Sequence, residues 1–331
     1  MPVYSTSLGC NAAPYIYNSS KTVFRVPMGT LHSDHAVEIY GSAVGTFTIA
    51  QGSSNSTEVE YETTLRADDQ SLLQEIFLEY STVDPEDGHV TNSRLLISTP
   101  HIEPRSLSCM RYDITMYVPP TLKRLRVAAH TTTHIQFDPD SNINLDGLLV
   151  NLYSMNAKNM ILPHEGLLAN HMTLELYRGW IVGDVSIVNS TIITTQRGDG
   201  ISNIRVHPTA PVDPALPDPA YLRTTTGAGR TDIFYVNHKE YPHRPIRSVH
   251  MSSRNADVYL TYRDAEYNGF IILNSHTYTS SGIKTIATDQ PETNDEADGN
   301  GGKMKWTHWV GNKDGGDKLF VRSRGWTGLY F

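Results

Sequence analysis

Short runs of alternating hydrophobic and polar residues follow one another along most of the chain, with Gly, Asn, Asp, Ser or Pro between them. In the first third these runs lie at 22–26, 37–40, 46–50, 57–66, 94–98 and 111–118. Alternation with a period of two is typical of strands that bury one face, as the strands of an antiparallel sheet do. Residues 1–120 are therefore predicted to form an N-terminal antiparallel β cap.

The segment 71–80 breaks this alternation. Its larger apolar residues have the spacing of one face of an amphipathic helix, and they are Leu72, Leu73, Ile76, Phe77 and Tyr80. The pattern predicts a short helix. A strand that pairs back onto the first sheet is the competing interpretation, because Ile, Phe and Tyr also favour pleated surfaces.

Pro119 and Pro120 mark a boundary, because neither residue can donate a backbone hydrogen bond to a sheet. Beyond this boundary, short strands are predicted at 125–129, 148–152, 172–176, 185–188 and 204–206. The turns between them are too closely spaced for crossover helices, which excludes an ordinary parallel α/β sheet. Residues 121–331 are therefore predicted to coil into a parallel β-solenoid, also called a β-helix.

Two segments interrupt the second half of the chain. Residues 207–230 are rich in Pro, Ala, Thr and Gly, which predicts an extended surface loop. Residues 288–302 are acidic and nearly devoid of apolar side chains, so burial cannot offset the entropy of ordering them. We expect a mobile surface loop there. Strand-like alternation resumes after each loop, which argues against domain linkers.

A polar turn followed by an alternating strand recurs in the second half, most clearly at 253–258 (SRNADV) and more loosely at 323–328 (SRGWTG). Such a unit describes one coil of a solenoid or one hairpin of a sheet. In these two stretches the chain resembles fungal members, of uncharacterised function, of the putative-adhesin β-solenoid family, although the second copy lacks the family's Asp. The resemblance implies a right-handed solenoid with an N-terminal β cap and an adhesin-like role. It implies no catalytic residue.

Composition narrows the range of partners. The chain has 27 Lys and Arg residues against 35 Asp and Glu residues, so it lacks the positive excess that binds phosphate backbones, and no nucleic-acid partner is predicted. No apolar run approaches the roughly 20 residues that span a bilayer, so no transmembrane segment is expected. Phosphate-binding and metalloprotease motifs are absent, and no cofactor is predicted. The oligomeric state stays open.

Signals for the cellular location point in two directions. The first residues have no basic flank followed by an apolar stretch, which a secretion signal would have. Yet Asn18, Asn55 and Asn189 each begin an N-glycosylation acceptor sequence, which suits an extracellular or cell-surface protein whose leader was removed. Cys10 and Cys109 allow one disulfide and no larger framework. Without a removed leader the chain would be cytoplasmic.

Candidate catalytic residues, should the protein be an enzyme, are His130, His134, Asp138, Asp140, Asp146 and Asp184. Residues four apart on one strand lie roughly 13 Å apart, so the two histidines are not expected to share a metal ion. Carboxylates on neighbouring coils can reach the separation that glycoside hydrolysis needs. Aspartates also serve turns by bonding the backbone two residues on, and this interpretation is favoured.

Candidate ligand-binding residues lie in two further segments. The loop 238–250 concentrates cationic and aromatic side chains that would suit an anionic sugar, at His238, Lys239, Tyr241, His243, Arg244 and Arg247. A solvated connection stiffened by proline is the favoured interpretation of this loop. Trp306, Trp309 and Trp326 gather near the end of the chain, where they would form either a sugar-stacking platform or, as favoured here, the plug of the solenoid.

Three functions follow from these observations. The first is a non-enzymatic solenoid that presents a glycan- or protein-binding surface, as an adhesin does. The second is a carbohydrate-active β-helix enzyme, a hydrolase or lyase, that uses Asp and His residues of neighbouring coils. The third is an enzyme that acts on a small hydrophobic metabolite between the cap and the solenoid. Two carboxylates clustered with a group of perturbed pKa in one concave groove would favour an enzyme, and an even distribution of aspartates in turns would favour binding or scaffolding.

Overall fold

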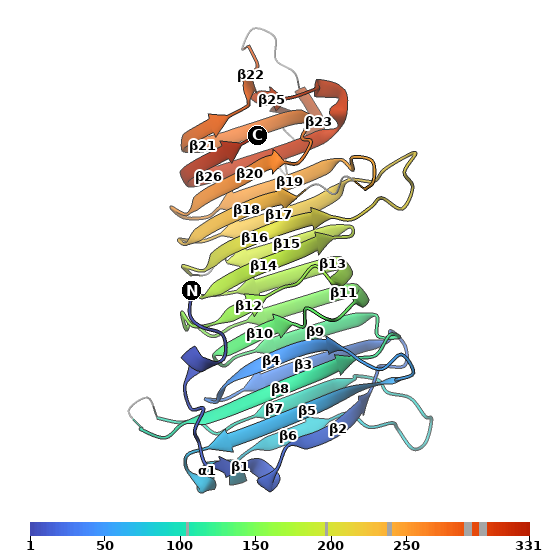
Figure 1. Cartoon of the computed structure of the whole chain (residues 1–331), viewed down its shortest axis with the longest axis vertical. Coiled ribbons are helices and arrows are strands. Elements are labelled where there is room, and N and C mark those ends of the chain that lie inside the picture. Colours follow the sequence, from blue (N-terminus) through green and yellow to red (C-terminus); the bar gives the residue numbers. More distant parts are fainter. Residues whose placement is uncertain (104–105, 196–197, 237–239, 288–292, 298–302) are drawn as a thin grey trace. The chain divides into compact units, whose positions relative to one another are not determined.

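The computed structural model describes residues 1–331 apart from 104–105, 196–197, 237–239, 288–292 and 298–302. The chain divides into two compact units, Met1–Gly183 and Asp184–Phe331. Strands make up most of the described structure (Figure 1), which confirms the predicted all-β class. The boundary predicted at Pro119 and Pro120 falls inside the first unit, between β8 (Met110–Val118) and β9 (Arg124–Ala129).

The first unit contains η1 (Thr6–Leu8), β1 (Tyr15–Ile16), η2 (Tyr17–Ser19), β2 (Thr22–Pro27), β3 (Asp34–Tyr40), β4 (Val44–Gln51), β5 (Glu58–Ala67), α1 (Gln70–Gln74), β6 (Phe77–Tyr80), β7 (Arg94–Ser98), β8, β9, β10 (Thr133–Phe137), β11 (Ile143–Leu152), β12 (Met160–Leu162), β13 (Leu167–Leu176) and the start of β14 (Trp180–Ile187). The second unit contains the rest of β14, β15 (Ser190–Thr195), β16 (Ile201–Pro208), β17 (Ala220–Thr226), β18 (Arg230–Val236), β19 (Ile246–Ser252), β20 (Asp257–Asp264), β21 (Gly269–Ser281), β22 (Lys284–Thr285), β23 (Thr293–Ala297), β24 (Lys303–Lys305), β25 (His308–Val310), η3 (Lys313–Gly315) and β26 (Asp317–Tyr330).

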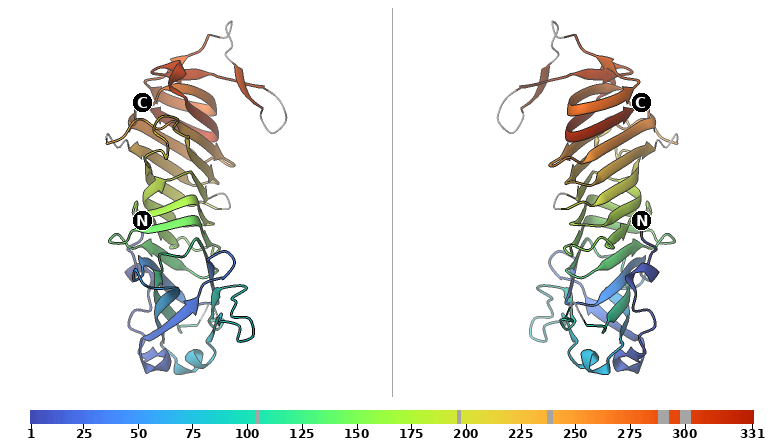
Figure 2. Two further views of the ribbon diagram at one scale, coloured as in Figure 1. Left: turned by 90° about the vertical axis from the view of Figure 1, so that its right-hand side faces the viewer. Right: turned by 90° about the vertical axis from the view of Figure 1, so that its left-hand side faces the viewer.

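The strands of the first unit form two ladders (Figure 2). In one ladder β7, β3, β9, β11 and β13 pair in parallel, and β6 adds an antiparallel strand beside β7. In the other ladder β8, β4, β10, β12 and β14 pair in parallel, while β5 pairs antiparallel with β8, β2 and β1. The pairing is therefore mixed. The predicted antiparallel arrangement of residues 1–120 is wrong for β3 and β4, because these strands pair with strands far along the chain and parallel to them.

The second unit also has two parallel ladders, and both end on the same strand, β26. One ladder runs through β15, β17, β19 and the first part of β26. The other runs through β16, β18, β20 and the last part of β26. Strand β21 pairs with β26 along nearly its whole length, and β25 and β22 continue antiparallel from β21. The final strand thus takes part in both ladders, which fixes its two halves against different neighbours.

Alternation along the strands determines which side chains form the core. In β5 the residues Val59, Tyr61, Thr63 and Leu65 are buried, while the residues between them are half-buried and face outward. The same alternation gives β26 its buried Leu319 and Leu329. Burying one face of strands such as β5 and β26 supplies the main driving force for folding, because apolar surface leaves water.

Buried polar turn residues tie neighbouring coils together in the first unit. Asn159 is fully buried, and its amide nitrogen donates to the carbonyl oxygens of Ser154 at 2.6 Å and Arg178 at 3.1 Å. Its side-chain oxygen accepts a hydrogen bond from the backbone nitrogen of Thr133 at 3.2 Å. One side chain therefore satisfies polar backbone groups from three successive turns, groups that would be costly to bury without a partner.

Two local predictions differ from the observed structure, and a third falls mostly outside the described residues. The predicted helix at 71–80 is a short helix, Gln70–Gln74, followed by a strand, Phe77–Tyr80, that pairs with β7, so each competing interpretation holds for one half. Asp69 caps that helix by accepting from the Ser71 backbone nitrogen at 2.9 Å. The loop predicted at 207–230 is interrupted by β17, whose apolar side chains are needed in the ladder. The loop predicted at 288–302 lies mostly outside the described residues.

Candidate binding surface

An aromatic surface covers the outward face of the last strands of the second unit. Strands β18, β20, β26 and β21 lie side by side there, and the register places Tyr259 of β20 beside Gly328 of β26. Their neighbours Val258, Leu260 and Leu329 are fully buried on the opposite, core-facing side. Because successive side chains of a strand alternate between faces, Tyr259, Trp326, Gly328 and Tyr330 share the outer face, and we call these four residues the platform.

The Trp326 ring lies against the backbone of Gly328. A Cβ atom at position 328 would come within 2.8 Å of the Trp326 ring and 3.0 Å of the Tyr330 ring. The Tyr259 ring centroid lies 4.8 Å from that of Trp326, with an angle of 47° between the ring planes. A glycine at position 328 thus leaves space that the Trp326 and Tyr330 rings occupy. Trp326 is half-buried, so part of the indole remains open to solvent.

Two arginines flank the platform. The Arg230 guanidinium carbon is 4.0 Å from the centroid of the Tyr259 ring, and that of Arg263 is 5.5 Å from the Tyr330 ring. Asp232 holds Arg230 through contacts of 2.7 to 3.0 Å, and these hydrogen bonds raise the pKa of Arg230. Arg230 is therefore a fixed cation whose remaining N–H groups can donate outward.

Hydroxyl groups line the adjoining edge of the platform. The register places Thr277 beside Trp326, Thr279 beside Gly328 and Ser281 beside Tyr330, and all three β21 residues are exposed. Aromatic faces with hydroxyl and guanidinium groups around them suit a ligand that has both apolar C–H faces and many hydroxyls. Sugars have that combination.

The two predicted histidines are separated by the fold. His130 follows β9 and is exposed, with its ring stacked between Tyr40 at 4.4 Å and Tyr153 at 4.5 Å. His134 lies in β10 and is fully buried, where its Nδ1 accepts from the Ser5 backbone nitrogen and its Nε2 donates to the Lys158 carbonyl. Burial lowers the pKa of His134 to about 4. Stacking engages the His130 ring, and hydrogen bonds engage both ring nitrogens of His134. Both residues therefore have a structural role.

The four predicted aspartates have separate partners. Asp138 accepts from Ser141 at 2.5 Å within a turn, and Asp140 is exposed in the same turn. Asp146 is exposed and accepts from Asn170 at 3.4 Å. Asp184, in the second unit, accepts from His207 at 2.7 Å and lies 3.6 Å from Arg205. These contacts match the turn interpretation for Asp138 and place none of the four against another.

The predicted cationic loop is engaged with the body of the second unit. Arg244 is buried, and it binds the Asp218 carboxylate at 2.7 Å and the Asp218 carbonyl at 2.7 Å. His243 contacts the buried Asp317 at 3.0 Å, and this hydrogen bond raises its pKa. Tyr241 donates to the Pro208 carbonyl, and Arg247 is half-buried in β19. His238 and Lys239 lie outside the described residues. Arg244 therefore anchors the loop, and its buried guanidinium is not available to a ligand at the surface.

The three late tryptophans have three different surroundings. Trp306 is buried between Phe270, at 5.2 Å, and Phe320, at 5.4 Å. Trp309 is half-buried, and the ammonium groups of Lys284 and Lys313 lie 4.3 Å and 5.2 Å from its ring. Only Trp326 of the three belongs to the platform. The signal that the sequence carried for the platform was the Trp-x-Gly-x-Tyr spacing at 326–330, which puts three residues on one face of a strand.

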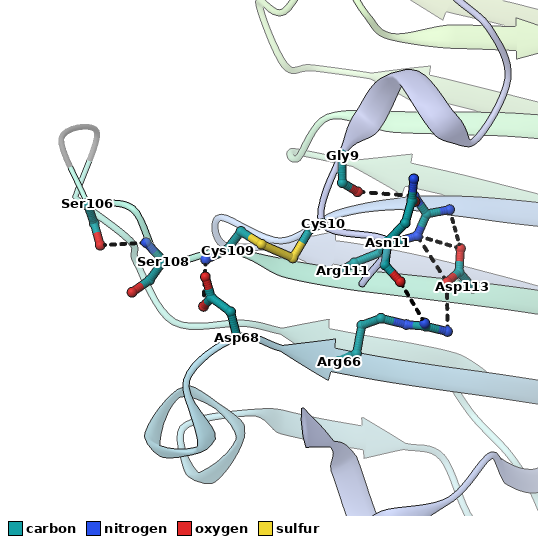
Figure 3. Close-up of a disulfide and its surroundings, with 10 residues drawn as sticks. All are labelled: Gly9, Cys10, Asn11, Arg66, Asp68, Ser106, Ser108, Cys109, Arg111 and Asp113. Atoms are coloured by element: carbon teal, nitrogen blue, oxygen red, sulfur yellow. Dashed lines mark hydrogen bonds and ion pairs between the residues drawn. A yellow bond between two sulfur atoms is a disulfide. The ribbon is translucent and has the colours of Figure 1, made fainter. Parts of the chain in front are cut away.

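The three glycosylation acceptors, Asn18, Asn55 and Asn189, are all exposed. The structure links Cys10 to Cys109 by a disulfide with a Cα–Cα distance of 5.9 Å (Figure 3). Beside this bond, the buried Arg111 donates to the Gly9 carbonyl at 3.2 Å and to Asp113 at 2.7 Å. The N-terminal segment is thus fastened to the first unit by both a covalent bond and a buried cation.

The described residues show neither a metal-binding cluster nor a membrane-spanning helix. In the part of the chain that the structure describes, no group of three or more His, Cys, Asp or Glu side chains is placed to hold a metal ion. Among the same residues, no helix is both long enough and apolar enough to cross a membrane.

Comparisons with known proteins match the chain at the level of structure alone. No family model matches the sequence, and neither does any curated protein. A putative adhesin structure from Bacteroides fragilis aligns at 10% identity over 96% of this chain and 98% of its own, with a TM-score of 0.42. A putative adhesin from Parabacteroides merdae aligns at 12% identity over 75% and 90%, with a TM-score of 0.36. A putative cell adhesion protein from Clostridium sporogenes aligns at 10% identity over 94% and 98%, with a TM-score of 0.27.

These structural neighbours carry the adhesin description that the sequence resemblance suggested, and they are bacterial where the resemblance was to fungal proteins. Identities and TM-scores at this level do not indicate what this chain binds. The chemistry of the platform is the observation that bears on its ligand.

Proposed function

We propose that this protein is a non-enzymatic, adhesin-like protein that binds glycans through the platform of Tyr259, Trp326, Gly328 and Tyr330. The observation that supports the proposal is the Trp326 ring packed beside Gly328, where a Cβ would be 2.8 Å from the indole. An indole packed against Gly328 and Tyr259 is pre-organised, so stacking a sugar on its solvent-exposed part costs little further side-chain entropy.

The polar surroundings support a saccharide over a purely apolar ligand. Arg230, held by Asp232, offers N–H donors beside the Tyr259 ring, and Thr277 and Thr279 offer hydroxyl groups beside Trp326 and Gly328. Sugars present hydroxyls around their edge and C–H groups on their faces, and this set of groups complements both.

We further propose that the parallel ladders are the coils of a right-handed β-solenoid with an N-terminal β cap. Supporting this, each ladder of the second unit takes every other strand, β15 with β17 and β19, and β16 with β18 and β20. Right-handed crossovers are the general rule for parallel strands. Stacked coils give a long, rigid side on which a binding platform can be displayed.

We place the protein outside the cell. The Cys10–Cys109 disulfide and the exposed acceptors Asn18, Asn55 and Asn189 support this location. Disulfides persist in oxidising, extracellular surroundings, and N-linked glycans are added only in the secretory route.

A glycan array followed by calorimetry on the best glycan tests the proposed function. Trp326→Ala should weaken binding at least roughly tenfold, because a stacked Trp contributes about 2 kcal/mol and each 1.4 kcal/mol is a factor of ten. Gly328→Ala should also weaken binding, because the added Cβ would push the indole off the sheet. Tyr278→Ala is the matched control, since Tyr278 is 48% exposed and alternates onto the opposite face of the same strand pair.

Equal binding by all four proteins would refute the platform. If the protein binds no glycan but binds a protein partner through the platform, the platform would be assigned to protein recognition instead. Mass spectrometry of the bound glycan should recover it intact, and cleaved products would show an enzyme.

A further inference from the structure

A polar groove of about 440 Å³ lies on the outer face of the first unit, and no platform residue lines it. Its floor is formed by outward-facing residues of β5, β2 and β8, and its rim by the loop between β4 and β5. The lining residues used below are Arg25, Asn55, Glu58, Glu60, Glu62 and Tyr117.

Asn55 sits on the rim and begins the acceptor sequence Asn55-Ser56-Thr57. Its side chain is exposed. The loop around it is fixed, because the Ser56 backbone nitrogen donates to the Ser53 carbonyl at 2.9 Å and the Ser56 hydroxyl donates to the Glu58 carbonyl at 2.8 Å. Whatever is attached to Asn55 is therefore held at the mouth of the groove.

The charges on the groove floor are largely compensated. Arg25 pairs with Glu60 at 2.8 Å, Lys21 pairs with Glu62, and the Tyr117 hydroxyl donates to Glu62 at 3.2 Å. The strand register places Arg25, Glu60 and Tyr117 in one row across three neighbouring strands. The floor thus combines one aromatic ring with the carboxylates of Glu58, Glu60 and Glu62, of which Glu60 and Glu62 have a cationic partner. Carboxylate oxygens accept hydrogen bonds from hydroxyl groups, so this lining suits a hydroxyl-rich ligand.

We infer that Asn55 carries an N-linked glycan whose first sugars lie in this groove, against Tyr117 and the glutamates. The glycan comes from a lipid-diphosphate-linked oligosaccharide. A C–N bond forms between the Asn55 amide nitrogen and the anomeric carbon, the sugar–phosphate C–O bond breaks, the amide nitrogen loses a proton and the lipid diphosphate leaves. The inference rests on the extracellular location proposed above and is independent of glycan binding by the platform.

Secretion of the full chain from a eukaryotic host, behind a cleavable leader, makes the inference testable. Glycopeptide mapping by mass spectrometry should find Asn55 occupied. Asn189 is a matched internal control, because it begins the same Asn-Ser-Thr tripeptide, is exposed, and is not among the residues that line the groove.

Native deglycosylation with a peptide N-glycosidase then measures whether the glycan rests in the groove. Release from Asn55 should be roughly tenfold slower than from Asn189, because sugar contacts worth about 1.4 kcal/mol oppose access of the enzyme. Tyr117→Ala should remove most of that difference at Asn55 and leave Asn189 unchanged. Tyr117→Phe keeps the ring and should keep the protection, which separates ring stacking from a loss of folding.

Two outcomes overturn the inference: an unoccupied Asn55 in the secreted chain, or equal release from Asn55 and Asn189. Unchanged glycan binding in Trp326→Ala would refute the platform and would leave both measurements at Asn55 unaffected, so failure of the platform and failure of this site are distinguishable.

Discussion

Removal of the disulfide between Cys10 and Cys109 should destabilise the first unit strongly. The bond joins residues 99 apart in sequence, and it connects the N-terminal segment to the start of β8 (Figure 3). A cross-link stabilises a fold mainly by restricting the unfolded chain, and the effect grows with the length of the closed loop.

The expected size follows from that loop. Chain-entropy arguments assign about 4.7 kcal/mol to a loop of about 100 residues at 25 °C. The folded state should change little when the bond is removed, because Arg111 still holds the segment through the Ser5 carbonyl at 2.9 Å and the Gly9 carbonyl at 3.2 Å. Ser5 also still donates its backbone N–H to His134. The loss should therefore lie almost wholly in the unfolded state.

Urea denaturation of the wild type and of the double variant Cys10→Ser, Cys109→Ser measures the effect. The free energy of unfolding of the first unit should fall by about 4 to 5 kcal/mol, and the m-value should rise because the unlinked chain exposes more surface on unfolding. Reduction of the wild type should reproduce the result, and the variant should not respond to the reductant. A loss below about 1 kcal/mol, or an unchanged m-value, would refute the reasoning that the bond acts through a long closed loop.

Three further predictions concern buried polar groups. Burial lowers the pKa of His35, in the first unit, and of His250, in the second unit, to about 3, below the ordinary 6.5. The stability that each neutral ring contributes is therefore present above pH 6.5 and lost as the pH falls. Each of these two rings should contribute a loss of about 2 kcal/mol between pH 7 and pH 5 in urea titrations, the buried His134 should add to the loss of the first unit, and a flat profile would contradict the assignment. The hydrogen bond to Asp317 raises the pKa of His243. This contact therefore stabilises the second unit below pH 6.5, and its contribution is lost as the pH rises through the raised pKa. In His243→Ala that part of the pH dependence of the unfolding free energy should vanish, and its persistence would point to another group. Asn159→Ala should cost about 3 kcal/mol or more in thermal or chemical unfolding, because it leaves buried backbone groups without partners, and a change near zero would show that water replaces the amide.

Strand-forming segments were predictable because their signal is local. The alternation at 94–98 matches β7, and the run at 57–66 matches β5 to within one residue at each end. The segment 71–80 shows where this reasoning weakens, because its pattern fits a helix and a strand, and the structure uses both in turn. Pairing with β7 decides the second half, and β7 lies outside any window that a local pattern covers.

The candidate site was harder to predict than the strands. Charge and turn residues drew attention to His134 and Arg244, yet both are buried and engaged by backbone groups or carboxylates. The platform depends on Tyr259 lying beside Gly328, a neighbour relation between residues distant in sequence. The number of residues between Tyr259 and Gly328 does not predict that they are neighbours, because the register of two parallel strands depends on the length and folding of the chain between them.

The all-β class, most strand positions and the only two cysteines available for a disulfide can be read from the amino-acid sequence. Each of these depends on alternation along one strand, on turn chemistry or on the presence of only two thiols. Three features depend on the folded arrangement: β3 and β4 are parallel to their neighbours, His134 is buried, and Tyr259 lies beside Gly328. Those features arise where segments far apart in the chain come into register, and packing between them sets a geometry that no local pattern encodes.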